Sequence, residues 1–392
     1  MPRVLRIINR LNLGGPTFNA ALLTKHMSPK YETLLVAGTK QDSEESSDFI
    51  VKDLGIDFRK IAHMKREINP IADYKAYQEL RSIIKEYKPD IVHTHAAKSG
   101  ALGRLAAIHS KVPVILHTFH GHVFHSYFNS TTTKVFLKIE RYLANKSSAI
   151  IAISQRQREE LVKDFKICDA SKMHVIPLGF NLDRFIDNQI VNRKKFRVKY
   201  ELADDEIAVT IIGRLVPVKN HAMFLRMVKS MQDQKNVRFF IVGDGESKKT
   251  LLELARSLGI DYTYFPDQPR RAQLTFCSWM KDAEVAVAGS DLITLTSYNE
   301  GTPVSLIEAQ AGGKAIISTN VGGIENVVKI NGTALLCEPD DDQLYLKHML
   351  NLTTNDSQRI NFGANGLNHV KDRYHYTRLV HDMMQLYGQL LH

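Results

Sequence analysis

The chain has 392 residues, of which 44% are hydrophobic and 24% charged, a composition typical of a soluble globular protein with two domains. Arginines interrupt the N-terminal apolar run and no window is apolar enough to span a bilayer, so we expect neither a signal peptide nor a membrane helix. Three widely separated cysteines, Cys168, Cys277 and Cys337, argue against a disulfide framework and fit a reducing cytoplasm.

The formal net charge of +10 points to an anionic partner, which would be a nucleic acid, a membrane surface or a substrate. Basic residues cluster at Arg59-Lys60, at Lys65-Arg66 and in the run 193–199. No helix-turn-helix pattern, zinc-finger spacing or aromatic RNA-binding pattern accompanies them, so we expect no nucleic acid. An anionic substrate and an anionic membrane face remain, beside the alternative that these residues are solvated surface.

Strands and helices alternate through the first half of the chain. Strands are predicted at 4–9, 33–37, 57–62, 89–95, 112–119, 149–153 and 174–176, and helices at 17–26, 71–87, 98–109, 131–145 and 155–165. This alternation predicts a parallel sheet covered on both faces. Gly14 and Gly15 follow the first strand, where glycines either let amides approach a phosphate or only permit a turn.

The segment 177–205 breaks this rhythm, and we expect residues 181–205 to be a linker between a domain at 1–180 and a domain at 206–374. In the second domain, strands are predicted at 207–212, 237–242, 262–265, 292–295, 315–318 and 333–337, and helices at 220–232, 247–258 and 304–311. Two or three further helices close the chain. The expected fold class is α/β, with two doubly wound Rossmann-like domains facing across a cleft.

The stretch between the predicted strands at 292–295 and 315–318 carries two carboxylates, Glu300 on a loop and Glu308 on the helix that follows. Between them, the backbone amides of Gly301, Thr302 and Val304 are unpaired donors at a helix N-terminus, where the dipole favours anions. The carboxylates could bind hydroxyls, and the amides could bind oxyanions. This combination suits a phosphorylated polyhydroxyl compound such as a nucleotide-sugar. Alternatively, Glu308 is a solvated helix residue and Glu300 caps its own helix.

Arg214 and Lys219 follow the predicted strand at 207–212, and a guanidinium with an ammonium suits a diphosphate. Seven histidines fall between His93 and His125, and neighbours two apart on a strand share a face, which permits metal chelation. No cysteine or carboxylate lies among them, so no metal site is expected. The preferred interpretation is that these histidines form hydrogen bonds to a sugar or phosphate.

Several of these stretches carry a resemblance to a known family. GRLVPVKN, IVGDGE, NEGTPVSLIEAQAGG, HTHAAKSGALGRLAA and HTFHGHVF resemble, in order and spacing, the retaining glycosyltransferases of family 4, which have the GT-B fold. The resemblance is to enzymes that build bacterial surface polysaccharides and covers nearly the whole chain. It implies that the last helix, at about 375–392, packs back onto the first domain.

The resemblance also implies roles for individual residues. It makes Glu308 a ligand of the ribose hydroxyls, and it makes Glu300 a ligand of a hydroxyl on the donor sugar and, with His120, part of the reacting centre. The remaining donor-binding residues would be Gly14, Gly15, Arg214, Lys219, Gly301, Thr302 and Val304. Thr302-Pro303 replaces an aromatic-glycine pair that is commoner in the family, so the donor sugar cannot be inferred from relatives.

The sequence therefore predicts a cytoplasmic, metal-independent, retaining glycosyltransferase without cofactors, which uses a UDP-linked sugar. Its expected acceptor is a saccharide or a lipid-linked saccharide in surface polysaccharide biosynthesis, and a lipid-linked acceptor would place it on the inner face of the plasma membrane. We expect Arg59, Lys60, Lys65 and Arg66 to contact that membrane face. The alternatives are a GT-B sugar-nucleotide epimerase and a non-catalytic module that binds sugar or nucleic acid.

Overall fold

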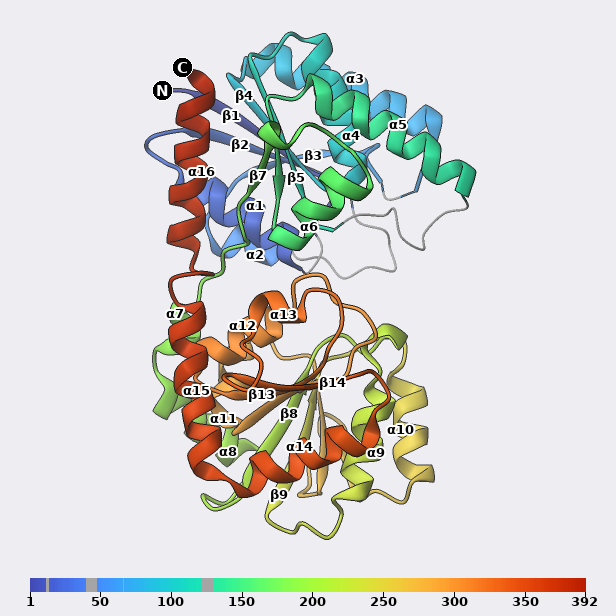
Figure 1. The fold of residues 1–392 in the computed structure, drawn as a ribbon, viewed down its shortest axis with the longest axis vertical. Helices are drawn as coiled ribbons and strands as arrows, with labels where there is room; N and C mark the ends of the chain where they lie inside the picture. The colour runs from blue at the N-terminus through green and yellow to red at the C-terminus, as the bar shows by residue number, and fades with distance from the viewer. Residues whose placement is uncertain (12–13, 40–47, 66, 122–129) are drawn as a thin grey trace. The chain divides into compact units, whose positions relative to one another are not determined.

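The chain divides into two compact units in the computed structural model: unit 1 is residues 1–180 with 374–392, and unit 2 is residues 181–373 (Figure 1). The structure describes all residues except 12–13, 40–47, 66 and 122–129, and the side chains of 130–132 also lie outside the description. Both units are α/β, as predicted, and each contains one parallel sheet. None of the helices in the described ranges combines the length and apolar composition that crossing a bilayer requires.

Unit 1 contains a seven-stranded parallel sheet in the order β3-β2-β1-β4-β5-β6-β7. Its strands are β1 (Arg3–Ile8), β2 (Glu32–Gly38), β3 (Phe58–Ile61), β4 (Ile91–His95), β5 (Val114–Phe119), β6 (Ala149–Ala152) and β7 (Met173–Val175). Its helices are α1 (Gly15–His26), α2 (Asp48–Asp53), α3 (Pro70–Tyr87), α4 (Ala97–His109), α5 (Ser130–Lys146), α6 (Gln155–Glu159) and α16 (Tyr376–Leu391). The strand order reverses between β1 and β4, the place where sheets of this type bind ligands.

The C-terminal helix α16 is part of unit 1 and lies beside α1 (Figure 1). Its inward residues, among them Leu379, Met383 and Tyr387, join a buried cluster with Val4 of β1. Arg378 donates hydrogen bonds of 2.8 Å to the carbonyl oxygens of residues 177 and 178, which fastens the start of the helix to the exit of β7.

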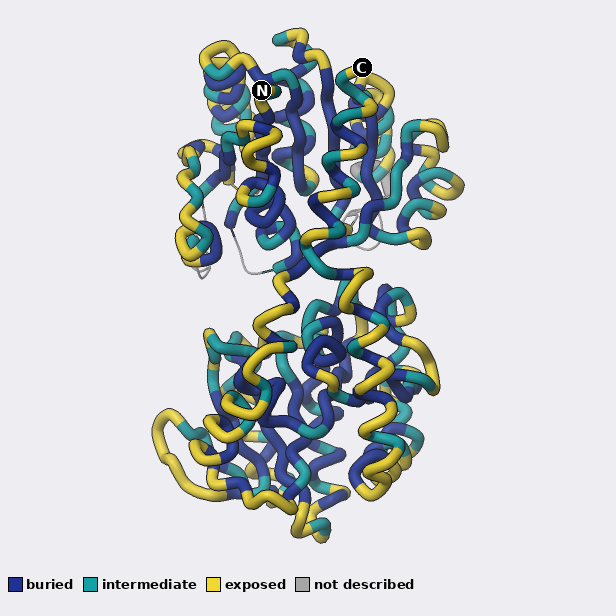
Figure 2. Tube along the Cα trace, turned by 90° about the vertical axis from the view of Figure 1, so that its left-hand side faces the viewer, coloured by how far each residue is buried: buried dark blue, intermediate teal, exposed yellow. Residues whose placement is uncertain are grey.

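Unit 2 also contains a seven-stranded parallel sheet, in the order β10-β11-β9-β8-β12-β13-β14. Its strands are β8 (Ile207–Ile212), β9 (Val237–Val242), β10 (Tyr262–Tyr264), β11 (Leu274–Ser278), β12 (Leu292–Leu295), β13 (Ala315–Thr319) and β14 (Ala334–Cys337). Its helices are α7 (Asp183–Ile186), α8 (Gln189–Lys199), α9 (His221–Ser230), α10 (Lys248–Ser257), α11 (Ala283–Gly289), α12 (Val304–Ala311), α13 (Ile324–Val327), α14 (Asp342–Thr354) and α15 (Asp356–Val370). The order reverses between β8 and β12. The strands of each sheet are buried along most of their length (Figure 2).

The prediction that residues 181–205 form a linker is wrong. The segment contains α7 and α8, and Phe196 and Tyr200 pack in a buried cluster with Phe240 of the unit 2 sheet. A Cβ atom at Gly289 of α11 would meet the Phe196 ring at 2.2 Å, so α8 and α11 touch closely. The basic run obscured this apolar face in the sequence, because Phe196 stands alone among cationic residues there.

β11 and α11 were not anticipated as separate elements. LTFCS is short and follows a polar, basic stretch, so the sequence offered little strand signal there. The apolar stretch AEVAVAG shows no helical periodicity because α11 is buried almost all round, at Val285, Ala286, Val287, Ala288 and Gly289.

Candidate functional site at the carboxyl edges of the two sheets

In unit 2, an ammonium and a carboxylate meet at the strand switch. Lys219 follows β8 and Glu300 follows β12, and because these strands are neighbours their loops adjoin. The Lys219 Nζ donates to Glu300 Oε1 at 2.5 Å, and the Ser297 Oγ donates to the same oxygen at 2.6 Å. The Glu300 side chain is only 8% exposed, so two donors hold this carboxylate in a fixed orientation.

The backbone of the Glu300 loop is fixed by the loop after β13. Thr319 Oγ1 donates to the Ser297 carbonyl at 2.6 Å, and the Gly323 amide donates to the Glu300 carbonyl at 2.9 Å. A Cβ atom at Gly322 would lie 2.0 Å from the Glu300 carbonyl oxygen, and one at Gly323 would lie 1.8 Å from that of Gly301. Only glycines allow so close an approach, and the second glycine pair of the motif therefore supports the first loop.

The amino end of α12 is open. Pro303 occupies the N-cap position, no side chain caps the helix, and no acidic residue lies in its first turn. Gly301 is exposed, while Thr302 and Val304 are partly exposed. The alternative that Glu300 caps its own helix is therefore wrong, and the first amides remain suited to an anion, as the helix dipole favours.

Glu308 lies one turn before the end of α12 and is partly buried. Burial raises the pKa of its carboxyl to about 7; the Arg184 guanidinium opposes this rise and the Glu284 carboxylate adds to it. Arg184 donates to Glu284 at 3.0 Å, so its charge is shared with a second carboxylate. Glu308 is thus a desolvated group and not a freely solvated helix residue.

Arg214, on the same loop as Lys219, is exposed, and its guanidinium has no hydrogen-bond or ion-pair partner within the described part of the chain. The loop itself is held by the turn after β9, since the Leu215 amide donates to the Asp244 carbonyl at 2.9 Å. A Cβ atom at Gly243 would lie 1.9 Å from the Gly213 carbonyl oxygen. A fixed backbone with a free cation suits an anionic ligand.

The end of β11 lies at the same sheet edge. Ser278 ends β11 and donates to Asp244 Oδ2 at 3.0 Å, and Lys248 donates to the same oxygen at 3.1 Å. Asp340, which we did not assign to the site, accepts from the Tyr298 hydroxyl at 3.0 Å and so ties the Glu300 loop to the region before α14. Ser297 and Asp340 were missed because nothing local distinguishes them from ordinary polar loop residues.

In unit 1, Gly14 is the N-cap residue of α1 and Gly15 its first residue. No side chain caps α1 and its first turn has no acidic residue, so its amino end is also open. Gly15 is buried against Leu178, whose Cδ1 lies 2.8 Å from the place a Cβ would occupy. Gly14 and Gly15 belong to unit 1, whereas the remaining predicted donor-binding residues belong to unit 2.

The histidines of unit 1 form a buried chain of contacts. The rings of His93 and His95 of β4 are tilted with centroids 4.3 Å apart, and His95 Nδ1 lies 2.9 Å from His120 Nε2. Arg6 of β1 is fully buried beside them. Burial, with smaller contributions from Arg6 and the neighbouring histidines, holds the pKa of His93 and of His95 well below the ordinary value, and burial lowers the pKa of His120 to about 3. These imidazoles are neutral at physiological pH.

Arg6 also bears on metal binding. Its guanidinium lies 3.1 Å from His93 Nδ1 and 3.4 Å from His95 Nε2, so a cation already occupies the space between these two nitrogens. Within the described ranges, no three His, Cys, Asp or Glu side chains gather as a metal site would require. His122 and His125 lie outside the described residues.

The four basic residues expected at a membrane carry less free charge than the sequence suggested. Arg59 donates to both carboxylate oxygens of Glu86 at 2.8 and 3.0 Å, and Lys60 pairs with Asp48 at 3.1 Å. Lys65 is exposed, and Arg66 lies outside the described residues.

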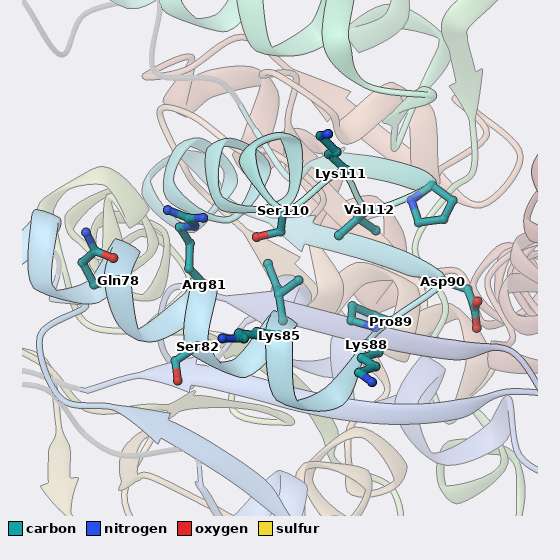
Figure 3. Close-up of a pocket in the computed structure, with 12 residues that line it drawn as sticks. Gln78, Arg81, Ser82, Lys85, Lys88, Pro89, Asp90, Ser110, Lys111 and Val112 are labelled. Carbon is teal, nitrogen blue, oxygen red and sulfur yellow. The ribbon is translucent and has the colours of Figure 1, made fainter.

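A hollow of about 770 Å³ lies at the other edge of unit 1, where α3 and α4 end (Figure 3). Arg81, Lys85, Lys88 and Lys111 line it together with Asp90. Cations at helix C-termini complement the helix dipole, which explains their position without a ligand. This hollow is distant from the carboxyl ends of the strands, where the candidate site residues lie.

Comparison with known proteins identifies the family. Residues 14–184 match the Glycosyltransferase Family 4 domain, and residues 192–369 match the Glycosyl transferases group 1 domain. The chain is 29% identical over 327 residues to the Escherichia coli UDP-Gal:alpha-D-GlcNAc-diphosphoundecaprenol alpha-1,3-galactosyltransferase, covering 82% of this chain and 81% of that protein. It is 24% identical over 342 residues to the Staphylococcus aureus capsular polysaccharide biosynthesis glycosyltransferase CapM, covering 85% and 86%.

Among solved structures, Anabaena HepE in complex with UDP has a TM-score of 0.81 at 17% identity, with 99% of this chain and 100% of that chain covered. At this identity the likeness establishes the fold. Two Rossmann-like units, two adjoining family matches and relatives that share most of their length with this chain agree with one another. The chain belongs to the GT-B glycosyltransferases, with a Glycosyltransferase Family 4 domain followed by a Glycosyl transferases group 1 domain.

Proposed function

We propose that the chain transfers a sugar from a UDP-linked donor to a lipid-linked saccharide, with retention of configuration and without a metal ion or other cofactor. The observation that carries the proposal is the Lys219–Glu300 pair beside the open amino end of α12. A cation, free amides and an oriented carboxylate together provide for a diphosphate and for the hydroxyls of the attached sugar.

The donor and the acceptor class are supported by the names of similar proteins. The Escherichia coli relative is named for a UDP-linked galactose donor and a diphosphoundecaprenol-linked acceptor, and the HepE structures contain UDP or UDP-glucose. CapM is named for capsular polysaccharide biosynthesis and Bacillus subtilis TuaC for teichuronic acid biosynthesis, which fits a role in building a surface polysaccharide.

Each candidate residue then has a role. Lys219, Arg214 and the amides of Gly301, Thr302 and Val304 would neutralise the diphosphate, which supports departure of UDP without a metal ion. Glu308 would accept hydrogen bonds from the ribose, and Glu300 from the transferred sugar. The amides of Gly14 and Gly15 would add donors from unit 1, where His120 would contact the reacting sugar.

A donor panel tests this proposal. The purified chain is incubated with UDP-, GDP- and ADP-sugars, with and without an undecaprenyl-diphosphate-linked saccharide, in the presence of EDTA. We expect release of UDP only when the acceptor is present, and a product whose new linkage keeps the anomeric configuration of the donor. Epimerised donor without a glycoside, an inverted linkage, or activity lost to EDTA and restored by one metal would each contradict the corresponding part of the proposal.

We also propose that the chain works on the inner face of the plasma membrane and that α5 contacts the lipid, in place of the cluster near residues 59–66. Val135, Ile139 and Tyr142 are exposed on one side of this helix at 52%, 44% and 51%. Lys134 and Lys138 stand beside them without ion-pair partners among the described residues. An exposed apolar stripe with flanking lysines is the composition that interfacial helices use on anionic lipid.

The single carboxylate of α5 supports this orientation. Glu140 is buried and accepts from Arg104 at 2.6 and 2.8 Å, so no acidic group of this helix opposes a negative surface. An apolar hollow of about 330 Å³ lies between α4 and α5 and is lined by Leu102, Leu105 and Ile139, among others. Such a surface offers both apolar contact and charge.

Vesicle sedimentation tests the membrane face. In the variant Lys134→Glu/Lys138→Glu, binding to vesicles containing phosphatidylserine should fall by at least tenfold at low salt, because each lysine contributes about 1 kcal/mol near such a surface. The matched control is Lys85→Glu/Lys88→Glu at the hollow of Figure 3, which has the same charge change and should bind almost as wild type. Equal losses in both variants would show only a general effect of net charge.

A further inference from the structure

The starting observation is a fully buried arginine without an acidic partner. Arg6 lies in the middle of β1 with an exposed fraction of 0%, and no carboxylate within the described residues pairs with it. Its contacts are His93 Nδ1 at 3.1 Å, His95 Nε2 at 3.4 Å, the Met27 sulfur at 3.4 Å and the Tyr387 hydroxyl. A buried cation that is held only by neutral acceptors is costly, which indicates that it does more than fill the core.

The contacts of Arg6 determine which nitrogen of each imidazole carries the proton. A guanidinium has hydrogen-bond donors and no acceptor, so His93 Nδ1 and His95 Nε2 must both accept. Because a neutral imidazole carries one proton, that proton lies on His93 Nε2 and on His95 Nδ1. The first of these nitrogens lies 2.7 Å from the hydroxyl oxygen of Thr118, which accepts from it.

The protonation of His95 also determines that of His120. His95 Nδ1 donates to His120 Nε2 over 2.9 Å, so His120 Nε2 is an acceptor and the proton of neutral His120 lies on Nδ1. His120 Nδ1 is buried and has no hydrogen-bond partner within the described part of the chain. Its N–H is therefore a donor already oriented and without an acceptor among the described residues. The two rings are stacked, with centroids 5.2 Å apart, which fixes the direction of this donor.

We propose that Arg6 is a positioning residue that acts through His95 to hold His120 in the Nδ1-protonated, neutral form, so that His120 donates a hydrogen bond to an oxygen of the bound sugar. His120 then stabilises substrate as a donor and does not remove a proton as a base. This role as a sugar ligand rests on the proposed glycosyl transfer. The chain of hydrogen bonds from Arg6 through His95 to His120, here called the relay, and the nitrogen that is protonated in each of its imidazoles do not depend on that function.

Tyr387 of α16 extends the same relay. Its hydroxyl lies 2.6 Å from His93 Nδ1, and its ring packs edge-on against that of Tyr31 at 5.5 Å. The C-terminal helix thus closes the buried end of the chain of contacts, while His120 stands at the other end. The relay crosses unit 1 from α16 through β1 and β4 to the residue that follows β5.

The first test needs no substrate and observes the wild-type chain, with one variant used only to assign a signal. In protein labelled with ¹⁵N-histidine, long-range ¹⁵N–¹H NMR distinguishes the two neutral forms of each imidazole, and His120 is assigned with His120→Gln. We expect protonated Nδ1 at His120 and His95, and protonated Nε2 at His93. A His120 protonated on Nε2, or charged at pH 7, would overturn the proposal. Because no turnover is measured, this outcome is independent of whether the proposed function is correct.

The second test removes the donor. Arg6→Met keeps the length and the contact with Met27 but supplies no hydrogen bond, so His95 and His120 should exchange between both neutral forms. We expect kcat to fall about tenfold, the factor for one lost hydrogen bond. The dissociation constant for UDP should stay unchanged, because neither Arg6 nor the histidines are assigned a contact with UDP. Arg6→Lys, which keeps a donor, should restore part of the loss.

The matched control is Arg104→Met/Glu140→Gln, which removes another fully buried arginine of unit 1 together with its partner. This control should lower stability to a similar degree and leave the protonation of His120 unchanged. An Arg6→Met protein that keeps the wild-type NMR pattern and wild-type kcat would overturn the proposal. A protein that shows the expected pattern but transfers no sugar from any donor would contradict the proposed function and leave the relay standing.

Discussion

At the point where the strand order reverses, the sheet of unit 2 carries an ammonium and a carboxylate, whereas the sheet of unit 1 carries imidazoles around a guanidinium. In unit 2 the groups are partly exposed and opposite in sign, and Arg214 adds a free cation at the surface. In unit 1 the pKa values of His93, His95 and His120 are lowered, and the Arg6 guanidinium beside them is fully buried.

The difference shows how one architecture supports two kinds of recognition. Free cations and open helix termini attract an anion, and a carboxylate held by two donors presents its remaining lone pairs to hydroxyls. Neutral, oriented imidazole donors suit uncharged sugar oxygens and would bind a diphosphate less tightly than the cations of unit 2. Each of the following predictions tests whether the charged and the neutral site keep these separate roles.

The largest expected effect is at the charged site. Glu300→Gln keeps the shape of the side chain but removes its charge, so Lys219 loses its ionic partner and the transferred sugar loses a strong acceptor. We expect transfer to fall by about 10²–10³-fold, the cost of removing one preorganised electrostatic group. Transfer assays with Glu253→Gln on α10, an exposed glutamate, as control should show no change. Near-normal turnover in Glu300→Gln would remove this residue from the site.

The next effect concerns the pH dependence of stability. Because the folded-state pKa of Glu308 is about 7 against an ordinary value of 4.5, the folded chain binds more protons than the unfolded chain between these values. This contribution to stability is fully present below about pH 4.5 and is lost as the pH rises through 7. In urea unfolding, the free energy of unfolding of Glu308→Gln relative to that of wild type should therefore rise by about 2 kcal/mol between pH 5 and pH 8. If the free energies of unfolding of Glu308→Gln and wild type changed equally with pH, the Glu308 carboxyl would not be desolvated.

A smaller effect is expected at the free cation. Arg214→Ala removes a charge-assisted contact to the diphosphate, so calorimetry should show the dissociation constant for UDP rising about tenfold. Its midpoint of thermal unfolding should not change, because the guanidinium has no partner within the described residues. Arg256→Ala on α10, also exposed, is the control and should bind UDP as wild type does. Unchanged UDP affinity in Arg214→Ala would place the diphosphate elsewhere.

The smallest effects compare one supporting hydroxyl in each unit. Ser297→Ala removes the second donor to Glu300, and Thr118→Val removes the acceptor at His93 Nε2. Each should lower kcat about two- to tenfold, the range of one neutral hydrogen bond. Raised salt should reduce UDP binding further in Ser297→Ala, whereas Thr118→Val should keep the wild-type salt dependence. An identical salt response in both variants would weaken the division between a charged and a neutral site.

Local sequence determined much of this protein. Apolar runs of strand length alternating with helical periodicity gave both parallel sheets, and glycine and proline positions placed Glu300, Lys219 and His120 on loops after strands. These signals are local because they depend only on neighbouring residues. Local patterns did not predict β11, α11 or the apolar face of α8, because the structure of these elements depends on partners elsewhere in the chain.

Only the tertiary structure decided which of these residues meet. Lys219 and Glu300 are 81 positions apart and touch because β8 and β12 are neighbours, an order that periodicity does not encode. In the same way, Arg59 is neutralised by Glu86, and Arg6 reaches His95 only because β1 lies beside β4. The sequence shows which positions carry ionisable side chains. The protonation state of each side chain and its ion-pair partner depend on the groups that the fold buries beside it.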